Sequence, residues 1–150
     1  MIQRKQTLYL LLAAILGVVT LSMSVATVTA DGLLTAQVYN LLWLDAHREA
    51  HYGVWPLFAM LLAASSVCLY AIFLFKRRIV QARLCLASMC LCLAWYIGVL
   101  VVSKSLAPDA HDFQLSLVGA LPAVMAILCF MARKAIMADE RLVRAADRIR

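Results

Sequence analysis

Three histidines and their acidic neighbours are the residues of this chain whose types suit metal binding. His47 and His51 are four residues apart with Glu49 between them, and His111 is followed by Asp112. Imidazole and carboxylate groups that share one helix face are typical zinc ligands. The order His-Arg-Glu-Ala-His differs from the His-Glu-x-x-His of zinc proteases, so no general base is in place. We therefore predict no metal, no haem and no other cofactor, and keep His47, His51 and His111 as candidate ligands if their two segments meet.

The five cysteines are the second group with reactive side chains. They are Cys68, Cys85, Cys90, Cys92 and Cys129. All lie in apolar stretches and none forms a Cys-x-x-Cys pair, so we expect free thiols buried as small apolar side chains. A membrane enzyme that forms disulfides needs a dithiol near the outer face, which disfavours that class. Because no other catalytic arrangement is visible, the sequence predicts no catalytic residue and no enzyme.

Four long stretches without Asp, Glu, Lys or Arg must position these residues. They are Leu8–Ala30, Ala50–Phe75, Leu84–Ser103 and Phe113–Ala132. A helix of about 20 apolar residues crosses a ~30 Å hydrocarbon core, and a charge at its centre costs roughly 2.5–3.5 kcal/mol. The chain is 65% hydrophobic and only 15% charged. Each stretch is therefore predicted to be a transmembrane helix.

The resulting prediction is an all-α polytopic membrane protein with one domain over residues 1–150. The spans are placed at about 8–30, 54–75, 84–103 and 113–132, with a cytoplasmic tail at 133–150. A signal peptide cleaved after Ala30 is the alternative for the first span. The spans contain no ionisable carboxylate or amine, which disfavours ion-coupled transport.

The basic residues predict the orientation of the chain. Twelve of the 14 lie in the first, third and fifth polar segments, which share one side if all four helices cross. The topology anchors are Arg4, Lys5, Lys76, Arg77, Arg78, Arg83, Arg133 and Lys134. Basic loops stay in the cytoplasm, so both termini are predicted to be cytoplasmic. An anionic-lipid site at the Lys76 to Arg78 run is the alternative, and this charge distribution argues against nucleic acid as a partner.

Several local patterns refine this prediction. Leucines and Val38 recur at helical spacing over residues 33–44, which predicts a short amphipathic helix on the outer surface. Trp55 and Pro56 should open the second span, and the short basic turn after it predicts an antiparallel hairpin with the third. Gly17 and Gly98 mark close approaches between helices.

The fourth span and the tail are predicted to form one basic helix. Pro122 lies near the middle of this span and should kink it. No Gly or Pro follows, so the helix should continue into the tail. There Ala135, Ala138, Leu142, Ala146 and Ile149 fall on one stripe. Arg141, Arg144 and Arg148 lie mostly opposite, as a surface for a partner or for anionic lipid.

Both ends of the chain resemble a known family. The opening Met1-Ile2-Gln3-Arg4-Lys5-Gln6-Thr7 and the closing Leu142-Val143-Arg144-Ala145-Ala146-Asp147-Arg148-Ile149-Arg150 are similar to those of small four-helix membrane proteins of Bacteroidetes-type bacteria. That family is catalogued as domain of unknown function 4293. Lys5 and Ala145 depart from its usual residues. The resemblance implies four spans in the inner membrane and no assigned activity.

Two functions are weighed from these observations. The first is a structural or accessory protein that docks a membrane or cytoplasmic protein through its cytoplasmic rim and residues 133–150. Arg4 could then pair with Asp139 or Asp147, and Gln6 could meet the tail. The second is a passive carrier or a binding pocket for a small apolar or lipid-like molecule. Small residues on every span leave open whether the chain forms a homo-oligomer.

Overall fold

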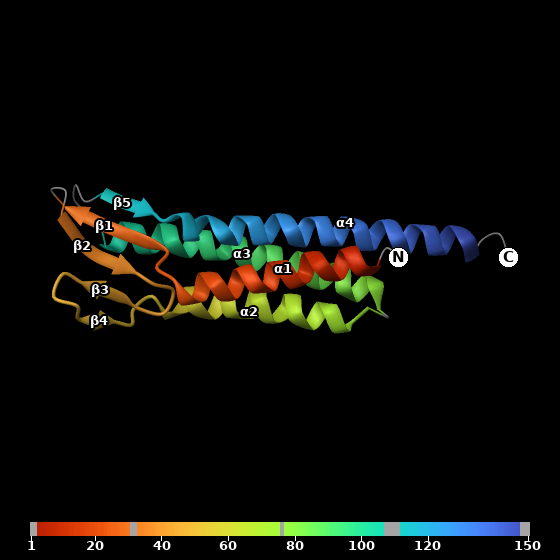
Figure 1. Ribbon diagram of the computed structural model, residues 1–150, viewed down its shortest axis with the longest axis horizontal. Helices are drawn as coiled ribbons and strands as arrows, with labels where there is room; N and C mark the ends of the chain where they lie inside the picture. Colours follow the sequence, from red (N-terminus) through yellow and green to blue (C-terminus); the bar gives the residue numbers. More distant parts are fainter. Residues whose placement is uncertain (1–2, 31–32, 76, 107–111, 148–150) are drawn as a thin grey trace.

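Four antiparallel helices lie side by side, and a β-sheet stands at one end of their bundle (Figure 1). The computed structural model describes residues 3–30, 33–75, 77–106 and 112–147. The helices are α1 (Gln3–Ser22), α2 (Trp55–Phe73), α3 (Arg78–Leu106) and α4 (Leu121–Asp147). Each helix packs against the next one along the chain, and α1 also packs against α4, which closes the ring.

The sheet shows that the all-α prediction is wrong. Its strand order is β4-β3-β2-β1-β5, and all neighbours are antiparallel. The strands are β1 (Ala26–Ala30), β2 (Leu33–Val38), β3 (Trp43–Asp45), β4 (Ala50–His51) and β5 (Asp112–Leu115). The first four connect α1 to α2, whereas β5 comes from the connection between α3 and α4. The fold is therefore a helical bundle with a five-stranded sheet at one end.

The predicted amphipathic helix over residues 33–44 is replaced by strands because its polarity alternates with a period of two. In β2, Ala36 and Val38 are buried, while Thr35 and Gln37 between them face the other side of the sheet and are half-buried. The leucines that flank this segment fit a helical spacing as well. The alternation is the signal that decides the structure.

The first helix ends at Ser22, eight residues before the predicted end of the first span. The Nδ2 of Asn40 donates a hydrogen bond to the carbonyl oxygen of Thr20 at 2.7 Å. A continuing helix would use that carbonyl for its own next turn. The Nε1 of Trp95 in turn donates to Asn40 Oδ1 at 2.8 Å, and all three residues are fully buried. After Ser22 the chain therefore leaves the bundle, and β1 takes its place in the sheet between β2 and β5.

The second and third helices follow the predicted hairpin. α2 begins at Trp55 with Pro56 in its first turn, as predicted. α3 begins at Arg78 and packs antiparallel to α2, which confirms the hairpin with a shorter turn. α3 also ends at Leu106, so it is longer than the predicted span at both ends.

The fourth helix begins later than predicted, and Pro122 does not kink it. A short 3-10 helix η1 (Leu117–Ala120) follows β5, and α4 starts at Leu121. Pro122 therefore lies in the first turn, where its missing N–H breaks no helical hydrogen bond. α4 then runs without a break to Asp147, which confirms the predicted continuation into the tail.

Two glycines mark the close helix contacts that the sequence predicts. A Cβ atom added at Gly17 of α1 would overlap the Oγ of Ser65 on α2. A Cβ atom at Gly98 of α3 would lie 2.6 Å from Leu57 Cδ2 of α2. Gly17 therefore leaves no room for a side chain between the helices, whereas a side chain at Gly98 would have to displace the end of the Leu57 side chain.

The hydroxyl of Tyr96 on α3 holds the start of α4. It donates to the carbonyl oxygen of Gly119 at 2.8 Å and accepts the backbone N–H of Ala123 at 3.1 Å. Gly119 lies in the 3-10 helix η1, and Ala123 belongs to the first turn of α4. One side chain thus bonds two backbone groups that the helix start leaves without helical partners.

Replacement of Tyr96 by phenylalanine is expected to lower the free energy of unfolding by about 1–2 kcal/mol, because two hydrogen bonds are lost while the ring stays in place. Titration of the purified protein with a denaturing detergent measures this change. Tyr70→Phe is the matched control, since this tyrosine is 59% exposed on α2 and should change stability by less than about 0.5 kcal/mol. Equal midpoints for the two variants would contradict the assigned role.

Candidate functional site

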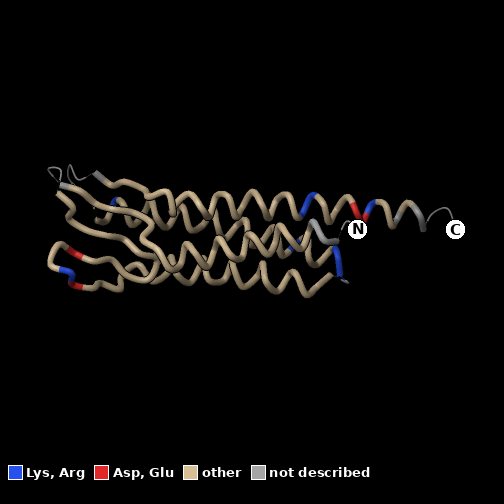
Figure 2. The backbone as a smooth tube through the Cα atoms, in the orientation of Figure 1, with Lys and Arg blue, Asp and Glu red and all other residues tan. Residues whose placement is uncertain are grey.

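Lys and Arg residues gather at the end of the bundle that lies away from the sheet (Figure 2). The start of α1, the turn between α2 and α3, and the C-terminal part of α4 all lie at this end (Figure 1). The described basic side chains here are Arg77, Arg78, Arg83, Arg133, Lys134 and Arg141; we call this surface the basic end. The other predicted anchors and partner residues lie outside the described part of the chain. This holds for the side chains of Arg4, Lys5 and Arg144, and for the whole of Lys76 and Arg148.

An ion pair joins two helices within the basic end. The Nη1 of Arg78 at the start of α3 lies 3.0 Å from Asp139 Oδ2 on α4 and also donates to the Asp139 carbonyl oxygen at 3.4 Å. Both side chains are partly exposed, so the pair fixes the position of α4 more than it stabilises the fold. The Asp139 carboxylate thus pairs with Arg78, while the predicted pairing of Arg4 with Asp139 or Asp147 involves side chains outside the described part of the chain. Gln6 near the start of α1 is buried within the bundle at 5% exposure.

The C-terminal part of α4 continues along the axis of the bundle beyond the other helices (Figure 1). Ile136 is fully buried, so α4 is still packed against its neighbours at this position. Further along, Leu142 is 62% exposed and Val143 is 42% exposed, beside the exposed Arg141. The tail is therefore a straight extension that presents apolar and basic side chains together.

Two grooves lie at the basic end. One has a volume of about 400 Å³ and separates the start of α3 from α4; its lining includes Arg77, Ile79, Glu140 and Val143. The other follows one face of α4 and has a volume of about 410 Å³. It is lined by Phe130, Arg133, Lys134, Met137, Ala138 and Arg141. Each groove combines guanidinium groups with apolar side chains, a composition suited to an anionic surface that also has apolar parts.

The histidines do not form the predicted pair on one helix face. His51 lies in β4 and stacks on Trp43 of β3, with ring centroids 4.4 Å apart and planes inclined by 20°. His47 lies in the turn between these strands, so helical spacing does not relate the two residues. His111 lies outside the described residues. Within the ranges that the structure describes, no three His, Cys, Asp or Glu side chains are placed to hold a metal ion.

The cysteines are free thiols, and four of them are buried as predicted, whereas Cys90 is exposed. Cys68 Sγ lies 3.1 Å from Ser88 Oγ and 3.4 Å from Cys129 Sγ, so these side chains connect α2, α3 and α4. Ser88 Oγ also donates to the carbonyl oxygen of Ala64 at 3.2 Å. All three side chains are buried, so this cluster acts as a polar packing contact between the helices.

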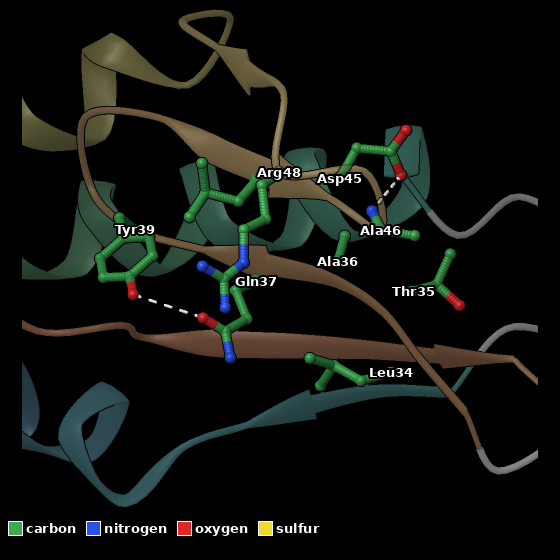
Figure 3. A pocket seen from close by; sticks show the side chains of 9 residues that line it. Leu34, Thr35, Ala36, Gln37, Tyr39, Asp45, Ala46 and Arg48 are labelled. Carbon is green, nitrogen blue, oxygen red and sulfur yellow. Dashed lines mark hydrogen bonds between the residues drawn. The ribbon is translucent and has the colours of Figure 1, made fainter.

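Sequence reasoning missed a polar pocket on the sheet. It has a volume of about 380 Å³ and lies beside β2 and the hairpin of β3 and β4 (Figure 3). Its lining is Leu34, Thr35, Ala36, Gln37, Tyr39, Leu44, Asp45, Ala46 and Arg48. These residues come together only because the segment forms strands, so the predicted helix hid the pocket.

Three helices in the described chain are long and apolar enough to cross a membrane. They are Trp55–Phe73, Arg78–Leu106 and Leu117–Val143, the last of which includes the 3-10 turn before α4. The apolar stretch of α1, Gln6–Ser22, is shorter. A large apolar surface on helices of this length indicates a membrane environment.

Comparison with known proteins connects the chain to one family. The match to "Domain of unknown function (DUF4293)" covers residues 2–149, which is nearly the whole chain. No curated protein matches it. The extent of the match agrees with the resemblance at both ends of the sequence. The chain therefore belongs to the family of domain of unknown function 4293.

Proposed function

We propose that this protein crosses the bacterial inner membrane four times, with both termini in the cytoplasm. α1 lies side by side with the three membrane-length helices, and its 20 residues span about 30 Å. Its outer side exposes large apolar side chains such as Leu8 (61%), Ile15 (50%) and Val18 (52%), which suit contact with lipid. The positive-inside rule then places the basic end in the cytoplasm and the sheet outside.

The function that this arrangement supports best is that of an accessory protein whose basic end docks an acidic partner protein. The observation that carries the proposal is the extension of α4, which presents Arg141 with Leu142 and Val143. Because α4 continues along the bundle axis past the other helices (Figure 1), the proposed orientation puts this part of the helix beyond the membrane surface instead of flat upon it. Exposed apolar groups with basic neighbours fit a protein interface better than a headgroup layer.

The test compares pull-downs from native membranes in mild detergent, using the intact chain and a chain truncated after Glu140. This truncation keeps the buried Ile136 and the ion pair of Arg78 with Asp139, so the bundle retains its contacts. An acidic protein should co-purify with the intact chain, be lost on truncation or in the Arg141→Glu variant, and dissociate at high salt. Lys104→Glu is the matched control, because Lys104 lies at the opposite end of α3 and the variant should keep the partner.

The same experiment can reject the proposal. If the intact and truncated chains bring down the same proteins, or only lipid, the tail does not dock a partner. The second candidate function is then the binding of a lipid-like molecule. An apolar groove of about 220 Å³ between α1 and α2 supports it. Leu11, Ile15, Val18 and Leu69 contribute to its lining. Lipids retained by the purified protein and lost in an Ala14→Trp variant would support that second function.

A further inference from the structure

The polar pocket on the sheet carries an inference beyond the proposed docking function, at the opposite end of the molecule. Its volume of about 380 Å³ falls within the range of roughly 300–1,000 Å³ that is usual for small-molecule sites. Figure 3 shows the side chains of Gln37 and Tyr39 on one side of the pocket and Asp45 on the other, with Ala36 between them. The pocket therefore has a polar group at each side of a less polar floor.

Arg48 occupies a strained backbone position beside this pocket. Its φ angle is 61°, in the left-handed region that a turn normally gives to glycine or asparagine. The turn is closed by hydrogen bonds from Arg48 N to Asp45 O at 2.8 Å and from Asp45 N to Glu49 O at 3.2 Å. An arginine that keeps this conformation in place of glycine indicates a requirement for its side chain.

The Arg48 side chain reaches from the hairpin toward Gln37 (Figure 3). Among the described residues it forms no ion pair, although Asp45 belongs to the same turn. The Oε1 of Gln37 accepts a hydrogen bond from the Tyr39 hydroxyl at 3.3 Å. The guanidinium group thus lies beside the polar side chains of Gln37 and Tyr39, and its N–H groups can donate hydrogen bonds to a ligand. A carboxylate is the acceptor that fits a guanidinium group best.

The Asp45 carboxylate lies at the other side of the pocket (Figure 3). Its Oδ1 accepts the backbone N–H of Ala46 at 2.7 Å, which fixes the orientation of the group. The described chain supplies no cation to this carboxylate. A fixed, unpaired carboxylate suits an ammonium group.

We propose that this pocket binds a short zwitterionic peptide of about two residues. Its C-terminal carboxylate pairs with Arg48 and its N-terminal ammonium pairs with Asp45. A dipeptide carries opposite charges at its two ends, and at roughly 3.3–3.6 Å for each residue it fits a pocket of about 380 Å³. The pocket lies on the sheet, at the end of the molecule away from the middle of the bundle (Figure 1), so the ligand is a dissolved peptide and not a lipid headgroup.

The test measures the thermal midpoint Tm of the full chain in nanodiscs, with glycylglycine, glycine or acetate plus methylamine as probes. Glycylglycine should raise the Tm of the unmodified protein and of Glu49→Gln, a charge change in the same turn outside the pocket lining. It should not raise the Tm of Arg48→Gly or of Asp45→Asn, whose amide oxygen can still accept the Ala46 N–H. Without ligand, Arg48→Gly should have a Tm higher by about 2–4 °C, because the strain is relieved.

Two results would overturn the proposal. One is that glycylglycine does not raise the Tm of the unmodified protein, or raises the Tm of the Arg48→Gly variant by the same amount. The other is a shift with acetate plus methylamine, or with glycine, as large as the shift with glycylglycine. In that case the pocket does not recognise two linked charges at the separation of a dipeptide.

Discussion

Asn40→Ala is expected to lower the free energy of unfolding by about 3–5 kcal/mol, the largest effect of any substitution considered for this chain. The change removes the hydrogen bond to Thr20 O and the one from Trp95 Nε1. It also leaves both of these partners buried without a substitute, which costs roughly 1–3 kcal/mol for each group. Because Asn40 lies between β2 and β3 and bonds both α1 and α3, the loss affects the junction between sheet and bundle.

Titration of purified variants with a denaturing detergent measures this effect. Thr35→Ala is the control on the same segment of chain, since its hydroxyl only reaches Leu33 O at 3.4 Å and the change should cost less than about 0.5 kcal/mol. Trp95→Phe should destabilise as well, and the double variant should be less destabilised than the sum of the single ones. An Asn40→Ala variant within about 1 kcal/mol of the unmodified protein would show that the network does not hold the junction.

Gly17→Val is expected to lower the free energy of unfolding by about 3 kcal/mol, because the new side chain has no room between α1 and α2. Its Cβ would overlap Ser65 Oγ, and Ser65 Cβ and Met125 Sδ would lie only 3.2 Å and 3.3 Å away. Ser65 is held by a hydrogen bond from its Oγ to Leu61 O at 2.9 Å, so it cannot move aside freely. The helices must therefore separate, and the packing on both sides of the contact is lost.

Gly98→Val is the matched control for this prediction. At this position the obstacle is Leu57 Cδ2, the end of a flexible side chain that can rotate, so the cost should be nearer 1 kcal/mol. Ser65→Ala should recover part of the stability that Gly17→Val loses, since it removes the overlapping oxygen. If both glycine variants lose equal stability, or Ser65→Ala recovers none, the contact between α1 and α2 is not as close as the structure shows.

The helical part of this fold can be predicted from the sequence because it depends on local composition. Charge-free stretches locate all four helices, and Trp55 with Pro56 gives the start of α2 correctly. The end of α1 cannot be predicted in this way. It depends on a hydrogen bond from Asn40, a residue 20 positions further along the chain, to a carbonyl that nothing local distinguishes.

The sheet was predictable in part, from signals that the helical interpretation set aside. Asp31-Gly32 lies between two alternating segments and is a typical hairpin sequence. The β-branched run of Thr27, Val28 and Thr29 also favours a strand over a helix. The pairing of β5 with β1 has no such local signal, because these strands are more than 80 residues apart.

The candidate sites show the same division between local and distant information. The basic residues of the basic end can be listed from the sequence, because their positions between apolar stretches are local facts. The pairing of Arg78 with Asp139 joins residues 61 positions apart and requires the packed helices. The pocket beside Arg48 depends on a turn conformation that an arginine rarely adopts, so residue type alone points away from it.

The extra length of α3 bears on how this protein tolerates membranes of different thickness. Its 29 residues extend about 44 Å, well beyond a hydrocarbon core of ~30 Å, while the 20 residues of α1 match that core. An overlong apolar helix normally tilts to hide its surplus from water. Here Val99, Val102 and Leu106 pack in the same apolar core as the buried face of the sheet, so protein covers one side of the surplus, while Leu100 and Val101 on its other side stay exposed. In the four-span arrangement proposed above, packing against the sheet reduces the hydrophobic mismatch at α3, and α1 and α2, with 20 and 19 residues, are the helices whose length matches the bilayer that the bundle prefers.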